Sequence, residues 1–275
     1  MIRIASMVGA PDLETPTLAP YGGDLQMAFA KLAALGYHGV ELMTKNPARL
    51  KGEKIRRWLD EHDLRMVGLC SGHVFGEDGV GLLRPDLTIN NAAAARLRDF
   101  IDFAATYFGP GTLVNIGRSR GVGDPSRPEE TMQTAAGALR ELAEYARPRG
   151  IGLVLEPIRR QEVNFIHSTQ EGLALARRVN HPNFGLMTDT YHMHFEDADV
   201  CASLREAVPL IWHVHFSDSN RCWPGSGDID YAAVVRTLRD INYSGFVSME
   251  IMVWPGADEA ASSAIEHIRR FLPKD

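Results

Sequence analysis

Four ionisable side chains stand at the ends of four successive apolar runs in the second half of the sequence. Glu156, Asp189, His215 and Glu250 are separated by 33, 26 and 35 residues. If each run is a β-strand, this spacing is close to one strand-and-helix unit, so the four groups fall at equivalent strand ends. Three carboxylates held that close would repel one another and raise one another's pKa unless a cation lies among them.

The four residue types suit a divalent metal ion. Three carboxylates and one imidazole combine hard and borderline ligands, a set that favours Mn²⁺, Co²⁺ or Mg²⁺. The competing interpretation, an isolated polar group at a strand end, accounts for one position better than for four equivalent ones. His213 precedes His215 by two residues and faces the same side of its strand, one layer deeper, where we expect a buried histidine that supports the ligands or the structure.

Short strand-like runs alternate with longer segments of helical periodicity along the chain. Strands are expected at residues 3–8, 39–43, 65–70, 112–116, 152–156, 184–189, 211–216 and 245–251. Helices are expected at 24–35, 53–62, 91–107, 129–147, 169–180, 198–208, 231–240 and 257–271. Strict alternation predicts a parallel sheet, and eight such units without a dividing linker predict an α/β protein, a single (β/α)₈ TIM barrel over residues 1–275.

Composition narrows the classes of function. The chain has 275 residues with 29 Lys and Arg against 35 Asp and Glu, a net charge of −6 that argues against nucleic-acid binding. No apolar run approaches the roughly 20 residues of a membrane helix, and no basic segment followed by a long apolar stretch begins the sequence. The three cysteines are too few and too scattered for a disulfide framework. We therefore expect a soluble cytoplasmic protein that binds neither nucleic acid nor membrane.

Several motifs follow the last four expected strands. They read LEPI at 155–158 with Glu162 nearby, TDTYHM at 188–193, HVHFSDSNR at 213–221, PGSG at 224–227 and VSMEI at 247–251. These motifs resemble the D-tagatose/D-allulose (ketose) 3-epimerase family of xylose isomerase-like TIM barrels, closely in the C-terminal half and only in architecture in the N-terminal half. The resemblance implies a metal-dependent isomerase, a 3-epimerase of a ketose or keto-sugar acid.

The resemblance also implies the roles of the four strand-end residues. Glu156, Asp189, His215 and Glu250 would bind one divalent ion, Mn²⁺ in the first place, with Co²⁺ or Mg²⁺ as alternatives. Glu156 and Glu250 would lie on opposite faces of the C3 carbon, so that one removes the C3 proton and the other returns a proton to the opposite face. The metal would act as a Lewis acid on the carbonyl and stabilise the enediolate.

Further residues are implied as substrate ligands. Glu162, His192 and Arg221 would hold substrate oxygens, although Glu162 also fits a solvated charged run and His192 a hydrogen bond within its loop. His73 follows the third expected strand and is a fourth candidate, with a structural role as the alternative. Glu41, in the second expected strand, would bind a substrate hydroxyl or only cap the strand.

The segment after the fourth expected strand departs from the ketose epimerases. Where several of them place an aromatic wall, this chain reads VNIGRSR at 114–120. Arg118 and Arg120 make a poor apolar wall but a suitable fork for a carboxylate. This feature resembles keto-sugar-acid epimerases such as 5-keto-gluconate epimerases. A keto-sugar acid and a neutral ketose both stay open as substrates, and so does a surface role for both arginines.

Three other functions share this type of barrel. An isomerase of the hydroxypyruvate isomerase kind moves a proton between C1 and C2, whereas a phosphodiesterase like endonuclease IV needs a larger metal cluster and a basic groove, which the net charge opposes. A non-catalytic sugar-binding protein would gain little from opposed Glu156 and Glu250. The expected partners are a small sugar or sugar acid and further copies of the chain, in a dimer or tetramer.

Overall fold

The computed structural model describes residues 2–15 and 18–273, so residues 1, 16–17 and 274–275 of the expected domain lie outside the described residues. Eight parallel strands pair in chain order, and the last pairs with the first to close a barrel. They are β1 (Arg3–Gly9), β3 (Gly39–Met43), β4 (Arg65–Cys70), β5 (Leu113–Ile116), β6 (Gly152–Leu155), β7 (Phe184–Asp189), β8 (Ile211–Phe216) and β9 (Phe246–Met249). The predicted TIM barrel is confirmed.

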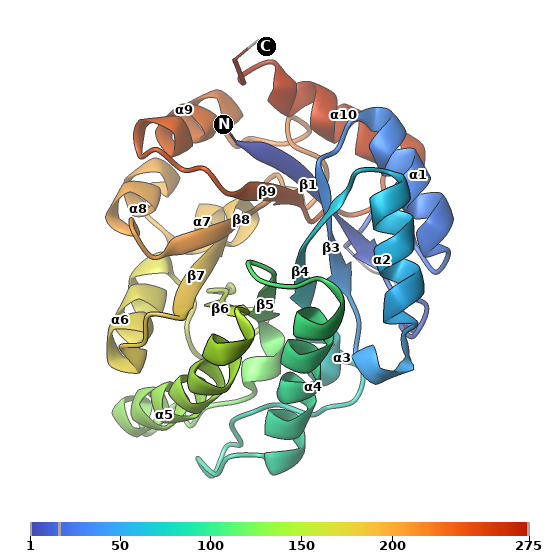
Figure 1. Ribbon diagram of the computed structural model, residues 1–275. Coiled ribbons are helices and arrows are strands. Elements are labelled where there is room, and N and C mark those ends of the chain that lie inside the picture. Colours follow the sequence, from blue (N-terminus) through green and yellow to red (C-terminus); the bar gives the residue numbers. More distant parts are fainter. Residues whose placement is uncertain (1, 16–17, 274–275) are drawn as a thin grey trace.

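Helices surround the strands (Figure 1). The eight that correspond to the predicted helices are α1 (Leu25–Leu35), α2 (Gly52–Glu61), α4 (Asn91–Tyr107), α5 (Pro128–Ala146), α6 (Thr169–Val179), α8 (Val200–Glu206), α9 (Tyr231–Asp240) and α10 (Ala257–Arg269). These eight helices and the eight barrel strands match the predicted segments, and no boundary differs by more than two residues. None of the helices within the described part of the chain is long and apolar enough to cross a membrane.

Six further elements between the barrel strands and these helices were not predicted. They are the two-residue strand β2 (Tyr21–Gly22), the helices α3 (Gly72–Gly76) and α7 (Thr190–Glu196), and the 3₁₀ turns η1 (Pro47–Arg49), η2 (Arg118–Arg120) and η3 (Arg147–Arg149). α7 begins directly after β7 because the Asp189 carboxylate accepts a hydrogen bond from the backbone N–H of Tyr191 and caps the helix. The chain therefore turns into a helix at the strand end itself.

Local chemistry explains where the long helices start and stop. Asp24 caps α1 by accepting from the Met27 N–H, and Gly36 ends it at a φ of 81°, a left-handed conformation that favours glycine. Ser168 starts α6 in the same way, and Asn180 ends it with a positive φ. The Asp199 side chain accepts from the Ala202 N–H, which places the start of α8 at Val200 rather than at the predicted residue 198.

The barrel strands are buried on both faces, as expected where helices cover the outside and side chains fill the inside. All residues of β3 and β7 are buried. A few polar side chains nevertheless lie in these apolar strands, among them Glu41 in β3, Asn115 in β5 and His213 in β8. Buried polar groups need partners, so these residues point to the part of the barrel where chemistry is organised.

Candidate active site

The four strand-end residues converge at one end of the barrel. Glu156 directly follows β6, Asp189 ends β7, His215 lies in β8 and Glu250 directly follows β9. Asp189 is in register with His215, which is in register with Ser248 on the other side. One side-chain ligand atom from each of the four residues lies within 4.8 Å of those of the other three, and all four residues are buried.

Three buried carboxylates in one cluster have strongly perturbed pKa values. Burial, reinforced by repulsion from Glu250, raises the pKa of Glu156 to about 8. Burial and the same neighbour raise the pKa of Asp189 to about 7. Burial would also raise the pKa of Glu250, but Arg221 and His215 outweigh it and hold that pKa well below its usual range. The cluster thus accommodates a full set of negative charges only with cations beside it.

The donor set fits a divalent ion. Glu156 Oε1 is buried without a hydrogen-bond partner among the described residues, although it lies 3.8 Å from both His215 Nδ1 and His192 Nε2. A buried carboxylate oxygen left in this way is costly, and a cation placed between it and the other ligand atoms would satisfy it. Three carboxylates and an imidazole within 4.8 Å supply such a cation with oxygen and nitrogen ligands.

A pocket of about 310 Å³ opens beside this cluster. Its wall contains two carboxylates of the cluster, those of Glu156 and Glu250. It also contains all four residues that were expected to bind substrate: His73, Glu162, His192 and Arg221. Apolar side chains such as Leu18, Met43 and Ile158 complete it. The fold therefore brings together, around one pocket, residues that lie far apart along the chain.

His192 faces the carboxylates with a defined nitrogen. Its Nδ1 accepts a 3.4 Å hydrogen bond from the backbone N–H of Arg159, so the proton of the neutral ring lies on Nε2. Nε2 is 3.8 Å from Glu156 Oε1 and 3.9 Å from Asp189 Oδ2. Burial holds the pKa of His192 well below its usual range, so the ring is neutral and offers one N–H to this space.

Arg221 contacts two members of the cluster directly. Its guanidinium donates hydrogen bonds to Asp189 Oδ2 and, at 2.6 Å, to Glu250 Oε2. It also lies 4.5 Å from the centre of the Tyr191 ring, a cation–π contact that fixes its plane. Arg221 has a φ of 64° in the turn after β8. Glu162, by contrast, pairs with Arg159 at 2.9 Å while it lines the pocket.

The two arginines after β5 have different environments. Arg118 is exposed and lines the pocket. Arg120 is only 2% exposed, and its guanidinium donates to four backbone carbonyls: Gly117 at 2.9 Å, Phe165 at 3.2 Å, Ile166 at 2.9 Å, and Glu156. The interpretations of Arg120 as a fork for a substrate carboxylate and as a solvated charge are both wrong, because the backbone already uses its N–H groups.

Three further residues lie close to the cluster: Glu41 differs from its expected role, His213 agrees with it, and Asn115 is new. Glu41 was expected to bind a hydroxyl or to cap its strand, but it is 1% exposed and bonds to His213, His215 and Cys70. His213 is buried, as expected. Asn115 was not predicted: its Nδ2 donates to Glu156 Oε2 at 3.3 Å and it lines the pocket. The only sequence signal for Asn115 is a polar residue near the end of an apolar strand.

The family model described as xylose isomerase-like TIM barrel matches residues 29–271. The chain belongs to this family. One solved structure of similar fold is D-allulose 3-epimerase from Methylomonas sp. in complex with D-allulose. It superposes on this barrel with a TM-score of 0.80 at 24% identity, covering 98% of each chain. The 3-keto-D-glucoside 4-epimerase from E. coli superposes with a TM-score of 0.81 at 19% identity, over 98% of this chain and 100% of that one. These likenesses concern the fold.

Curated relatives match a shorter stretch of this xylose isomerase-like chain. An L-ribulose 3-epimerase from Methylomonas sp. strain DH-1 is 31% identical over 159 residues, which are 51% of this chain and 56% of the relative. A D-psicose 3-epimerase from Agrobacterium fabrum is 37% identical over 115 residues, 42% of this chain and 40% of the relative. The chain spans about half the length of the curated relatives it matches.

Proposed function

We propose that this chain is a metal-dependent sugar epimerase that inverts C3 of a ketose or keto-sugar acid. The observation that carries the proposal is the pair Glu156 and Glu250, two buried carboxylates that line one pocket. They come from β6 and β9, which are separated in the barrel by β7 and β8. Epimerisation needs two such groups, one for each face of the inverted carbon. The relatives, which are epimerases of ribulose and psicose, support the same reaction class.

Glu156, Asp189, His215 and Glu250 would hold one divalent ion, Mn²⁺ in the first place, with Co²⁺ or Mg²⁺ as alternatives. When bound, such an ion supplies Lewis acidity at the sugar carbonyl and offsets negative charge that develops on the sugar oxygens. The unpartnered Oε1 of Glu156 supports this assignment.

The chain's own residues would move and hold the protons. One of the two glutamates removes the C3 proton from one face of the sugar, which leaves an enediolate, and the other returns a proton to the opposite face. His192 presents its Nε2–H to the same space and would donate it to a sugar oxygen. Arg221 would bind an oxygen beside Asp189 and Glu250, and Glu162 and His73 would bind hydroxyls along the pocket wall.

The test is exchange of the C3 proton in D₂O. Metal-free protein is loaded with Mn²⁺ and incubated with a panel of ketoses and keto-sugar acids, after which manganese is removed and products are analysed by NMR. We expect deuterium at C3 of a substrate and the appearance of its 3-epimer. Exchange at C1 or C2 without change at C3 would indicate an aldose–ketose isomerase, and binding without exchange at any carbon would indicate a sugar-binding protein.

Glu156→Gln and Glu250→Gln separate chemistry from folding. Each variant keeps the shape of the side chain but loses the base, so we expect epimer formation to fall by about 10²–10⁴-fold with the circular dichroism spectrum unchanged. Because the two glutamates serve opposite faces, one variant is expected to retain C3 exchange of one epimer only. Near-normal turnover in either variant would refute the acid–base role of that glutamate. The proposal also includes a dimer or tetramer of the chain, which sedimentation measures.

A further inference from the structure

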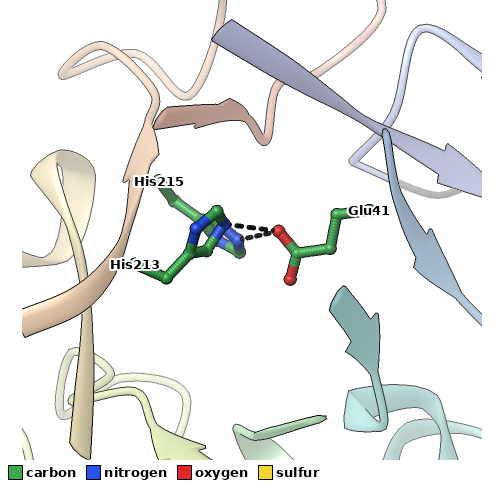
Figure 2. Close-up of side chains that lie close together, drawn as sticks. All are labelled: Glu41, His213 and His215. Atoms are coloured by element: carbon green, nitrogen blue, oxygen red, sulfur yellow. Dashed lines mark hydrogen bonds and ion pairs between the residues drawn. The ribbon is translucent and has the colours of Figure 1, made fainter. Parts of the chain in front are cut away.

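Behind the cluster, one carboxylate crosses the inside of the barrel to meet two histidines. Glu41 extends from β3 toward His213 and His215 on β8, as Figure 2 shows. Its Oε2 lies 2.7 Å from His213 Nε2 and 2.9 Å from His215 Nε2, and none of the three residues is more than 1% exposed. β3 and β8 are not neighbours, because β9 and β1 lie between them in the barrel. Strand pairing alone therefore does not produce this contact.

The hydrogen bonds around Glu41 define which atoms carry protons. A carboxylate oxygen accepts, so each histidine donates from Nε2. The other oxygen, Oε1, accepts a 2.9 Å hydrogen bond from the Cys70 thiol. Cys70 Sγ in turn accepts from Asn115 Nδ2 at 3.4 Å, and the same amide nitrogen lies 3.3 Å from Glu156 Oε2. A continuous chain of buried contacts thus joins two of the strand-end residues from behind.

The consequence falls on the second nitrogen of His215. If Nε2 keeps its proton when an ion binds, Nδ1 is the nitrogen that gives up its proton and offers its lone pair to the ion. Nδ1 lies 3.2 Å from Glu250 Oε2 and 3.8 Å from Glu156 Oε1, so it points into the group of strand-end ligands. A histidine that binds metal through one nitrogen commonly donates its other N–H to a carboxylate, which fixes the ring and makes the ligand more basic.

We infer that Glu41 is a positioning residue that holds His215 in the tautomer and orientation in which Nδ1 binds the divalent ion. The inference rests on the proposed metal site and adds the residue that sets its affinity. His213 supports Glu41 from the other side of the same oxygen, and Cys70 fixes the second oxygen.

The rival interpretation is that Glu41, His213 and His215 form a second metal site, since their ligand atoms also lie within 4.8 Å of one another. The geometry disfavours it, because Oε2 is already at hydrogen-bond distance from both nitrogens. An ion between these atoms would need about 2.0–2.2 Å to each ligand and the loss of both Nε2 protons. The number of ions bound separates the two interpretations.

The experiment is calorimetric titration of Mn²⁺ alone into the metal-free protein. Glu41→Gln is expected to weaken the binding of one Mn²⁺ by about 10- to 100-fold, as for other residues that support a metal ligand. Glu77→Gln is the matched control: it makes the same change at a half-buried residue whose carboxylate bonds to Thr15 and Lys45 and to none of the four ligands. It is expected to lower thermal stability and leave the Mn²⁺ affinity within about twofold of the parent.

The outcomes are distinct. If the parent protein binds no Mn²⁺, the proposed metal site fails. If the parent binds one ion and Glu41→Gln binds it equally tightly, the metal site stands and this inference is overturned. Two ions in the parent and one in Glu41→Gln would identify a second metal site and would also overturn it.

A second measurement needs no variant and covers the case in which Glu41→Gln does not fold. In the parent protein loaded with Mg²⁺, nitrogen NMR of the imidazole rings is expected to show the His215 proton on Nε2. A proton on Nδ1 of His215 would contradict the inference.

Discussion

Glu156 and Glu250 are the same residue type in one pocket, yet their surroundings separate their acidities. Among the described residues, the carboxylate of Glu156 accepts one 3.3 Å hydrogen bond from the Asn115 amide and none from an arginine, so burial raises its pKa to about 8. Glu250 accepts from Arg221 at 2.6 Å and contacts His215 at 3.2 Å, which together hold its pKa well below the usual range. Pairs of carboxylates with separated pKa values are typical of sites that use one acid and one base.

Substitution of Arg118 tests whether the pocket accepts a keto-sugar acid or a neutral ketose. A charge-assisted bond between its guanidinium and a substrate carboxylate is worth about 1.5–3 kcal/mol, which is roughly ten- to hundredfold in affinity. We therefore expect Arg118→Ala to lower kcat/KM for a keto-sugar acid by about that factor and to leave a neutral ketose almost unaffected. Steady-state kinetics with both substrates measures this difference.

Arg118→Lys is the control, because it keeps the charge and loses the planar fork. It is expected to recover part of the activity toward the acid. Small and equal effects of Arg118→Ala on both substrates would show that Arg118 does not bind a substrate carboxylate. They would favour a neutral ketose as the substrate.

At the residue scale, the sequence predicted groups that end a strand and missed groups that act across the barrel. Glu156 and Asp189 are recognisable because each follows an apolar run at a repeating interval. The contact of Glu41 with His215 joins residues 174 positions apart, and nothing in either local sequence specifies it. Asn115 is similar, since its role depends on the side chain of Glu156 beyond the next helix.

At the scale of elements, short segments after the strands supply part of the pocket wall. η2 follows β5 and presents Arg118 to the pocket while it turns Arg120 inward. The long helices were predictable from periodicity and caps, whereas these short turns have too few residues for a period. Their conformation depends on contacts with other loops, such as the bonds from Arg120 to residues 165 and 166.

Arg120→Ala tests this contact between loops. The substitution removes a donor from four buried carbonyls, and only those of Gly117 and Ile166 also accept from a backbone N–H among the described residues. We therefore expect the free energy of unfolding to fall by about 3 kcal/mol, measured by urea denaturation. Arg118→Ala removes the same side chain two residues away on the surface and is expected to change stability by less than about 0.5 kcal/mol. A loss of stability of the same size in both variants would contradict the clamping role of Arg120.

At the scale of the whole molecule, the four strand-end residues come from the ends of β6, β7, β8 and β9, which make up half of the closed barrel. The sequence predicted this architecture because eight alternating units of regular length have few other ways to bury their apolar faces. A ligand that binds all four residues would hold these strands together and favour the folded state over the unfolded one.

Metal binding is therefore expected to stabilise the whole protein. Mn²⁺ at about 100 times its dissociation constant contributes about 2.7 kcal/mol, which raises Tm by about 5 °C. Chelation should remove both this increment and activity, and Mn²⁺ or Co²⁺ should restore them. Full activity after exhaustive chelation, with elemental analysis confirming the loss of metal, would refute the mechanism.

The pH dependence of this stabilisation has a definite sign. The pKa of Asp189 is raised to about 7 and that of Glu156 to about 8, so below these values both carboxyls hold protons that a metal ion must displace. The affinity for Mn²⁺ should rise as the pH increases through this range, with release of protons on binding. Calorimetry in buffers of different ionisation enthalpy counts these protons, and an affinity independent of pH would contradict the assignment.

The four bonds of Arg120 also bear on how such barrels are engineered. The buried guanidinium of Arg120 joins residues 117–121 after β5 to residues 156–166 after β6 through its bonds to the carbonyls of Glu156, Phe165 and Ile166. Replacing only one of these loops with a loop from another barrel would leave either the arginine without its acceptors or the carbonyls without their donor. The two segments therefore form one exchangeable module, and a change of substrate preference at this rim requires both loops to be transferred together.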